Sequence, residues 1–388
     1  MSMTYQFITA DMIVSGQRSI YSVKEKVASF TPSLTSVLIV TQDTIKNLGF
    51  IDILQEQLAS PETTIEVNTN ILPEPTLENI EAVYHDVSAK AYDLIIGIGG
   101  GSVLDATKIL SVLMTNNQSI SDMLGTDLVK EPGIPTVLIP TTSGTGSEVT
   151  PNAIVTLPEE ELKVGIVSRH LLPSLVILDP ELTLGLPKPI TAATGMDAFT
   201  HSLESFISNK ANPFSDMFAL ESIRLISSSI VEAYENGSSV QARENMLVGS
   251  MYGGMALTAA GTAAVHALAY PLGGKYHIPH GEANSMLLPH VMNVNMDAII
   301  DRLYLVAEPM GISITNKSKE TIAKEVITVI EEWTATLNIP QNLSDYGVKE
   351  EDLKELAVSA SKVTRLLNNN PKELSLEDME NIYRKLLP

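Results

Sequence analysis

The chain has 388 residues, of which 44% are hydrophobic, and it carries 25 Lys and Arg residues against 46 Asp and Glu residues. This length predicts two domains, and the formal charge of −21 disfavours nucleic acid and anionic membranes as partners. Because cysteine is absent, disulfides and thiolate zinc sites are excluded, and any metal must be bound by histidine and carboxylate.

The chain begins with MSMTYQFITADMIVSGQ, which has no basic stretch followed by an apolar one, as a secretory signal would. No run of the sequence reaches the roughly 18 apolar residues that a membrane helix needs. We therefore expect a cytoplasmic protein.

The first half of the chain predicts a parallel sheet with crossover helices. Four short runs are apolar almost throughout, as expected of strands that are covered on both faces: residues 36–41, 94–98, 136–139 and 175–178. After a Pro-Glu-Pro turn, residues 76–90 carry apolar side chains at helical spacing, and the Thr76 side chain can cap the start of that helix.

Three consecutive glycines follow the second of these runs, in the segment DLIIGIGGGSVLDATK. We expect a helix that opens at Ser102, is capped by the Ser102 hydroxyl, and offers free backbone N–H groups to a phosphate. By itself the motif is also compatible with an ordinary glycine turn between a strand and a helix.

A second loop follows the third run and reads PTTSGTGSE, from Pro140 to Glu148. Its hydroxyl groups and glycines are expected at the carboxyl ends of parallel strands, where ligands bind in open α/β sheets. Although the loop could be a solvated surface segment, the two loops together favour a nucleotide site. Neither is a P-loop, because no Gly-Lys-Ser/Thr follows the glycines.

From about Pro187 onward the pattern becomes helical, and we place the domain boundary between residues 1–183 and 184–388. Near the C-terminus, residues 344–356 and 375–386 predict two surface helices. The second of these has a helix-start signal at Ser375.

Two patterns in the helical half are candidates for a metal site. Asp197 and His201 are four residues apart and would share one face of a helix, although such a pair is often an ordinary charge pair. Four of the seven histidines fall within 25 residues: His266, His277, His280 and His290. The segment 271–274 (PLGG) is expected to end the helix that carries His266 and to begin a loop that carries His277 and His280.

A carboxylate with several imidazoles suits Fe(II) or Zn(II) rather than magnesium or calcium. Such an ion can bind an alcohol oxygen or polarise an aldehyde carbonyl. Spacing alone leaves this site open, because each histidine could equally be an ordinary hydrogen-bonded residue.

Four motifs, in this order, closely resemble the iron-containing, group III alcohol dehydrogenase family: GGGSVLDATK, PTTSGTGSE, DPELTLGLP with ATGMDAFTHSLES, and HALAYPLGGKYHIPHGEAN. The resemblance extends from about residue 5 to the final helices. It implies an α/β N-terminal Rossmann-like dinucleotide-binding domain and an all-α C-terminal metal-binding domain, a fold shared with dehydroquinate synthase. It also implies Fe(II), with Zn(II) as the alternative ion, together with NAD or NADP, and a homodimer or higher homo-oligomer.

The resemblance also assigns roles to individual residues. The metal ligands would be Asp197, His201, His266 and His280, which leaves His277 outside the ligand set. The pyrophosphate would be bound by Gly99, Gly100, Gly101 and Ser102, with support from Asp105 and Lys108. The remaining dinucleotide contacts would come from Gln42, Thr141, Thr142, Thr145 and Lys163. Asn152 would approach the nicotinamide and the substrate, and the substrate pocket would include Leu257, Tyr270 and His277.

The chain departs from the family pattern at three positions. Tyr270 stands where many members have a second histidine, so Tyr270, His277 or the cofactor ribose with water would carry the proton. Gln42 replaces an aspartate that would repel the 2′-phosphate of NADP, which leaves the choice between NAD and NADP open. Glu74-Pro75 replaces a frequent Asn-Pro, which puts a cofactor contact from that position in question.

The sequence thus predicts a metal-dependent, NAD(P)-linked alcohol dehydrogenase or aldehyde reductase, and aldehyde reduction is the preferred direction. Its substrate would be a small aliphatic or short anionic aldehyde, and Lys275 and His277 weakly favour the anion. A sugar-phosphate cyclase-type lyase of the same fold is one alternative, although the site region is poor in Lys and Arg. A catalytically silent, oligomerising paralogue is the other, and the complete ligand set speaks against it.

Overall fold

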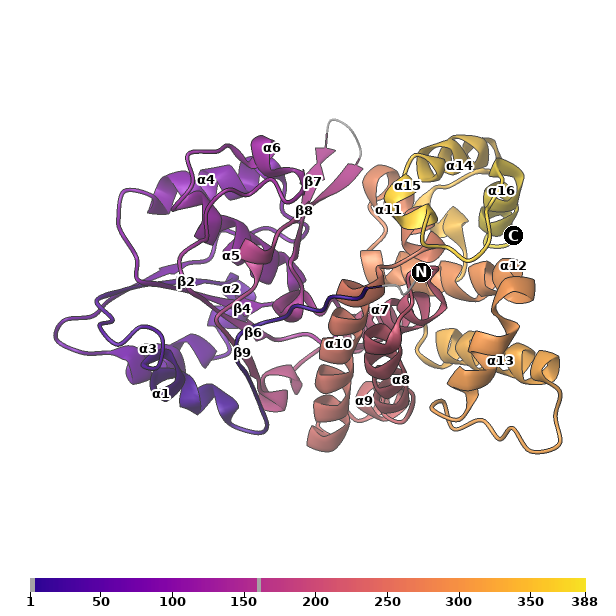
Figure 1. The fold of residues 1–388 in the computed structure, drawn as a ribbon, viewed down its shortest axis with the longest axis horizontal. Helices are drawn as coiled ribbons and strands as arrows, with labels where there is room; N and C mark the ends of the chain where they lie inside the picture. The colour runs from indigo at the N-terminus through magenta and orange to yellow at the C-terminus, as the bar shows by residue number, and fades with distance from the viewer. Residues whose placement is uncertain (1–3, 159–161) are drawn as a thin grey trace. The chain divides into compact units, whose positions relative to one another are not determined.

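The computed structural model describes residues 4–158 and 162–388, which form two compact units (Figure 1). An α/β unit comprises Ile8–Thr142 and Gly146–Gly185. A helical unit comprises Leu186–Pro388 together with residues 4–7 and Ser143–Thr145. The short segment 143–145 of the second hydroxyl-rich loop therefore belongs with the helices.

The α/β unit is built on a six-stranded parallel sheet in the order β1-β9-β6-β4-β2-β3. Its strands are β1 (Ile13–Ser15), β2 (Ser36–Val40), β3 (Thr64–Asn68), β4 (Leu94–Gly99), β6 (Thr136–Pro140) and β9 (Leu175–Leu178). Every residue of β4, β6 and β9 is buried, as expected of strands covered on both faces. The four predicted strands are confirmed.

Helices cover both faces of this sheet. On one face α1 (Val23–Val27) and α3 (Phe50–Leu58) pack against the strands, and on the other face α4 (Leu77–Val87) and α5 (Gly101–Leu113) do so. Alternate residues of β2 belong to opposite cores, with Val37 and Ile39 on the first face and Leu38 and Val40 on the second.

Smaller elements complete the α/β unit. The helices α2 (Asp43–Lys46) and α6 (Ile120–Met123) are single turns. A second, three-stranded sheet contains β5 (Gly125–Thr126), β7 (Asn152–Leu157) and β8 (Leu162–Val167), and β7 pairs antiparallel with β8.

The helical unit packs its helices around one hydrophobic core. They are α7 (Lys188–Ile207), α8 (Pro213–Ser227), α9 (Ile230–Glu235), α10 (Val240–Ala260), α11 (Ala264–Tyr276), α12 (His280–Ala307), α13 (Lys319–Thr336), α14 (Leu353–Ser361), α15 (Thr364–Leu367) and α16 (Leu376–Arg384). Residues 195–207 of α7 are all buried, so this helix is enclosed by its neighbours. Its Phe199 packs edge-on against Trp333, with 5.1 Å between the ring centres.

Helix starts in the α/β unit agree only in part with the sequence. Thr76 caps α4 as predicted, because its hydroxyl oxygen accepts a 3.2 Å hydrogen bond from the Asn79 N–H. The prediction that Ser102 caps the next helix is wrong. Helix α5 begins one residue earlier, after Gly100, and the Ser102 hydroxyl instead accepts a 3.1 Å hydrogen bond from the Glu74 N–H.

The helical unit differs from the sequence prediction around Pro271. Helix α11 does not end at this proline but continues to Tyr276, and His280 is the first residue of α12 rather than a loop residue. An interior proline costs a helix about 3 kcal/mol, which burial of the neighbouring Leu268 and Leu272 offsets here.

The C-terminal prediction is half confirmed. Ser375 caps α16 in a capping box with Asp378. Residues 344–356 are not one helix, because Gly347 takes a left-handed conformation with φ of 86° between two short 3₁₀ turns, and α14 begins only at Leu353.

Among the described residues, no single helix is long and apolar enough to cross a membrane. Helices α10 and α11 reach the required length and composition only as a pair, and they are bent by 107° where they meet.

Candidate metal centre

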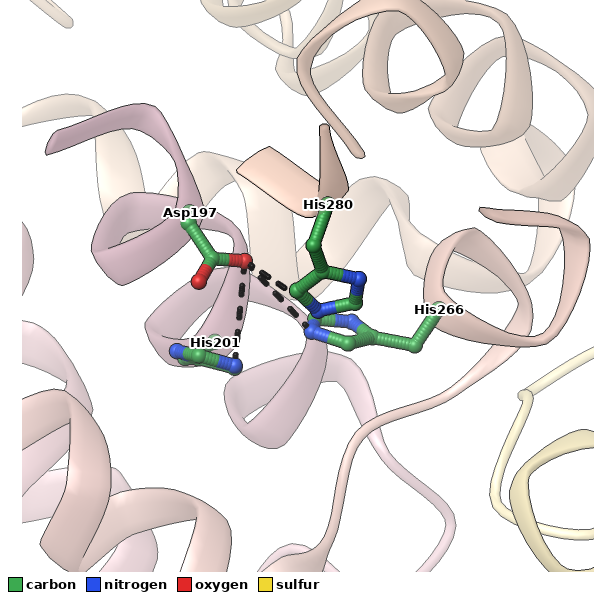
Figure 2. Close-up of side chains that lie close together, drawn as sticks. All are labelled: Asp197, His201, His266 and His280. Atoms are coloured by element: carbon green, nitrogen blue, oxygen red, sulfur yellow. Dashed lines mark ion pairs between the residues drawn. The ribbon is translucent and has the colours of Figure 1, made fainter. Parts of the chain in front are cut away.

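Three helices bring Asp197, His201, His266 and His280 together (Figure 2). Asp197 and His201 lie one turn apart on α7, His266 lies on α11, and His280 opens α12. One potential ligand atom from each side chain lies within 4.8 Å of all the others. Tertiary packing thus gathers residues that are separated by up to 83 positions in the chain (280 − 197).

The spacing of these atoms fits a four-coordinate ion. From Asp197 Oδ1, the Nε2 atoms of the three histidines lie at 3.8 Å (His201), 3.7 Å (His266) and 3.8 Å (His280). A regular tetrahedron with metal–ligand bonds of about 2.1 Å has edges of about 3.4 Å, close to these distances. A modest contraction would bring the four atoms to bonding distance.

Electrostatics in the cluster favour a bound cation. Burial by itself would raise the pKa of the Asp197 carboxyl, but the charges of the three histidines and a hydrogen bond from Asn284 together hold it at about 2. Burial also lowers the pKa of His201, against the opposing effect of Asp197. The aspartate is therefore ionised and His201 neutral near pH 7, which are the protonation states that bind metal.

A second layer of groups orients two of the histidine rings. The buried Glu204 carboxylate accepts 2.6 Å hydrogen bonds from His266 Nδ1 and from the Val265 N–H. His201 Nδ1 lies 3.3 Å from the Gly144 carbonyl oxygen. With Nδ1 as the donor in each ring, the Nε2 lone pairs of both histidines point into the cluster.

Asn284 lies one turn after His280 on α12 and completes the cluster. Its Nδ2 donates a 2.7 Å hydrogen bond to Asp197 Oδ1 and lies 3.2 Å from Nε2 of both His266 and His280. Its Oδ1 is buried and has no hydrogen-bond partner among the described residues. A buried, unsatisfied oxygen beside four potential ligands fits a site that a cation completes.

Sequence reasoning missed both Glu204 and Asn284, although each had a local signal. Glu204 follows His201 by three positions and Asn284 follows His280 by four, so each lies near a candidate ligand on the same helix.

Tyr270 also lies near the centre. It is one turn beyond His266 on α11, and its ring centre is 6.1 Å from that of His280. Burial raises the pKa of the Tyr270 hydroxyl, against the opposing effect of the positive charge of Arg365. The hydroxyl is therefore protonated near pH 7.

The other residues that the sequence assigned to the substrate pocket occupy different environments. Leu257 is half-buried on α10. His277 is exposed and follows the last residue of α11 in a left-handed conformation with φ of 54°. Lys275, which favoured an anionic substrate, forms an ion pair with Glu355 at 2.6 Å and a longer one with Asp352 at 3.8 Å. Its charge is neutralised within the protein.

The two glycine-containing loops of the α/β unit follow two neighbouring parallel strands, at the carboxyl ends of those strands. Gly99 to Gly101 join β4 to α5, and Thr141 and Thr142 follow β6. A Cβ atom at Gly99 would lie only 2.7 Å from the Val103 side chain, so only glycine allows α5 to start this close to the strand.

Asp105 and Lys108 of α5 tie the two loops together. Asp105 accepts hydrogen bonds from the Ser147 hydroxyl and, at 3.0 Å, from the Ile154 N–H. The buried Lys108 ammonium donates to the backbone carbonyls of Ser147 and Asn152 and forms a 3.2 Å ion pair with Asp105. Asn152 begins β7 at this junction.

Gln42 and Lys163 lie elsewhere in the same unit. Gln42 follows β2, and its side-chain amide donates a 3.0 Å hydrogen bond to the Ile71 carbonyl. Lys163, on β8, forms a 2.7 Å ion pair with Glu74, the residue whose backbone N–H contacts Ser102.

Comparison with known proteins identifies the family. The family model for iron-containing alcohol dehydrogenases matches residues 10–180. The family model for the C-terminal region of Fe-containing alcohol dehydrogenases matches residues 191–387. The chain belongs to the iron-containing alcohol dehydrogenase family. The resemblance seen in the sequence is thereby confirmed.

Individual members of the family are similar over most of their length. Long-chain-alcohol dehydrogenase 1 of Geobacillus thermodenitrificans (strain NG80-2) is 39% identical over 350 residues, which are 89% of this chain and 88% of that protein. Sulfoacetaldehyde reductase of Bilophila wadsworthia (strain 3_1_6) is 35% identical and covers 97% of each chain. The crystal structure of a 1,3-propanediol oxidoreductase has a TM-score of 0.94 at 34% identity and covers 99% of this chain and 100% of its own.

These relationships confirm the predicted fold and the class of enzyme. As an iron-containing alcohol dehydrogenase, the protein is a metal-dependent oxidoreductase of alcohols and aldehydes.

Proposed function

We propose that Asp197, His201, His266 and His280 bind Fe(II), with Zn(II) as an alternative ion, and that the enzyme reduces a short aldehyde beside them. The observation that carries this proposal is the cluster of four ligand atoms within 4.8 Å. A bound ion supplies Lewis-acid polarisation of the substrate oxygen. Glu204 and the Gly144 carbonyl hold His266 and His201, and the unsatisfied Asn284 oxygen adds further support.

The glycine loop and the threonine loop would bind the dinucleotide, which supplies or accepts the hydride. The turn from β4 into α5, formed by Gly99, Gly100, Gly101 and Ser102, would bind the pyrophosphate with its backbone N–H groups. Thr141 supports this assignment, because its hydroxyl is buried and has no partner among the described residues. Thr142, Thr145, Lys163 and Asn152 would complete the contacts along the cofactor, supported by Asp105.

Gln42 bears on the choice of cofactor. Its side chain is an uncharged amide bound to the Ile71 carbonyl, so this position places no carboxylate against a 2′-phosphate. We therefore expect NADPH to be tolerated alongside NADH, and paired assays with the two cofactors test this.

The Tyr270 hydroxyl is our candidate for the group that donates a hydrogen bond to the substrate oxygen. Its raised pKa keeps it protonated, so it serves as a donor rather than as a base. His277, which is exposed, is the alternative candidate for the proton relay, and the half-buried Leu257 would supply apolar contact to the substrate.

The test is reconstitution followed by assay. Metal-free protein is loaded with Fe(II) or Zn(II), its metal content is measured by elemental analysis, and short aldehydes are supplied with NADH and with NADPH. We expect one ion per chain and net oxidation of the cofactor. Stoichiometric metal without net cofactor oxidation would favour a cyclase-type lyase, and absence of both would favour a silent paralogue.

A further inference from the structure

Glu74 joins two parts of the α/β unit that are proposed to contact the cofactor. Its backbone N–H donates a 3.1 Å hydrogen bond to the hydroxyl of Ser102, at the turn from β4 into α5. Its carboxylate forms a 2.7 Å ion pair with the ammonium of Lys163 on β8. One residue therefore links the proposed phosphate-binding turn to a lysine that is 89 positions away in the chain.

The backbone on both sides of Glu74 is held in place. Glu74 lies between Pro73 and Pro75. The Pro75 carbonyl accepts a 3.1 Å hydrogen bond from the Thr156 N–H of β7, and Thr76 forms a β-bridge with Thr156. Glu74 itself takes a left-handed conformation with φ of 51°. Asparagine or glycine adopts this conformation at less cost than glutamate, so the reason for a glutamate here is to be sought in its carboxylate.

The two side chains of this ion pair differ in exposure. The side chain of Lys163 is only 10% exposed, whereas that of Glu74 is 40% exposed. A largely buried ammonium needs a partner for its charge, because its removal from water costs free energy. The carboxylate already contacts water, so it can turn to solvent when another group takes the ammonium. The lysine can therefore change partners while it stays on β8.

We propose that Glu74 competes with the dinucleotide for the Lys163 ammonium. When the cofactor binds, the ammonium leaves the carboxylate for an oxygen of the cofactor, and the carboxylate turns to solvent. This inference rests on the proposed function, because it requires the cofactor to bind beside Ser102. Glu74 is then a positioning residue, which lowers the affinity for the cofactor by holding the lysine that binds it.

The size of the effect follows from the occupancy of the ion pair. An apparent dissociation constant equals the intrinsic one divided by the fraction of molecules that are ready to bind. If Glu74 holds the ammonium in roughly nine-tenths of the molecules, removal of its charge should tighten cofactor binding about tenfold. The gain should require Lys163, since without the ammonium there is nothing for the carboxylate to compete for.

The test measures the dissociation constants of NADH and NADPH for the metal-loaded enzyme, by titration of the nicotinamide fluorescence. Glu74→Gln keeps the length of the side chain and removes its charge, so it should bind the preferred cofactor about tenfold more tightly than the wild type. Glu74→Asn, which suits the left-handed backbone, should show a similar gain. Lys163→Met should bind more weakly than the wild type, and Glu74→Gln added to it should give no gain.

A matched control separates this effect from a change in net charge. Glu66→Gln breaks a 2.6 Å ion pair with Lys90 in the same unit. Since neither of these residues contacts the turn at Ser102 in the proposed scheme, Glu66→Gln should bind the cofactor like the wild type.

Four outcomes would overturn the inference. Glu74→Gln could bind the cofactor no more tightly than the wild type, or Glu66→Gln could show the same gain. Lys163→Met could bind as tightly as the wild type, or Glu74→Gln could give its full gain in the Lys163→Met background, which would indicate direct repulsion of the phosphates. In each case the wild type still binds the cofactor, so the proposed function survives. Failure of the wild type to bind either dinucleotide would instead contradict the proposed function, and this inference with it.

Discussion

Glu204 and His266 share a 2.6 Å hydrogen bond between a carboxylate oxygen and Nδ1 in the interior of the helical unit. Because the same carboxylate also accepts the Val265 N–H, it fixes both the ring and the start of α11. Glu204→Gln should therefore weaken metal binding by about 10- to 100-fold, as loss of such supporting contacts does elsewhere. Competition with a chelator measures this, and Glu221→Gln, which changes a half-buried carboxylate paired with Arg224, should bind metal like the wild type.

Asn284 should contribute to the same affinity through its contacts with Asp197, His266 and His280. Asn284→Ala removes the 2.7 Å hydrogen bond to Asp197 and the unsatisfied oxygen near the ion site. We expect metal affinity about 10- to 100-fold below wild type and an altered absorption spectrum of the Co(II)-loaded protein. Asn293→Ala, which changes an exposed residue of the same helix, is the control. An unchanged spectrum and affinity in Asn284→Ala would remove Asn284 from the metal environment.

His266 is proposed as a metal ligand, whereas His277, 11 positions later in the chain (277 − 266), is not. His266→Ala should abolish stoichiometric metal binding and activity. Only three ligands remain, so one coordination position is open, and the imidazole ring that the Glu204 carboxylate orients is lost. His277→Asn should keep one metal per chain, because asparagine tolerates the left-handed conformation of that position. Elemental analysis of both purified variants is sufficient, and full activity with normal metal content in His266→Ala would refute the site.

Gly144 connects the hydroxyl-rich loop to α7. A Cβ atom at this position would lie 2.7 Å from Thr194 Cβ and 3.1 Å from Thr194 Cα, so Gly144→Ala must push the loop away. Such overpacking costs about 1–3 kcal/mol, and it would displace the carbonyl that faces His201 Nδ1. We expect a lower thermal midpoint and weaker metal binding together. Gly185→Ala, where no atom lies within 4 Å of the added carbon, should change neither.

The raised pKa of the buried Glu148 carboxyl predicts that the stability of the α/β unit depends on pH. Burial raises the pKa of its carboxyl from 4.5 to about 7, against the opposing effects of a backbone hydrogen bond and Lys108. Between these values the folded protein retains a proton that the unfolded chain releases, so this contribution to stability is complete below pH 4.5 and is lost as the pH rises through 7. Glu148→Gln should remove this decline from the thermal midpoint of the metal-free protein. If the wild type and Glu148→Gln follow parallel curves, the buried carboxyl does not titrate in this window.

Helices and strands with strong local signals were predictable from sequence. The apolar runs of β2, β4, β6 and β9, the Thr76 cap and the Ser375 cap follow from patterns within a few residues, and each occurs in the structure. Ser102 and Pro271 were misread because a partner from another segment decides their role. The Glu74 N–H occupies the Ser102 hydroxyl, and the core around Leu268 and Leu272 keeps α11 intact across the proline.

By itself, the sequence determined the family, the alternation of strands and helices, and the four residues proposed as ligands. These depend on residue types at short spacing and on motifs that occur in a set order. Tertiary structure decided which side chains stand behind those ligands and which nearby charges are already neutralised. Lys275 is neutralised by acidic residues about 80 positions away, and Asn284 donates to Asp197 from 87 positions away (284 − 197). Such contacts arise only when separate helices pack, because hydrogen bonding and charge pairing act over a few ångströms and not along the chain.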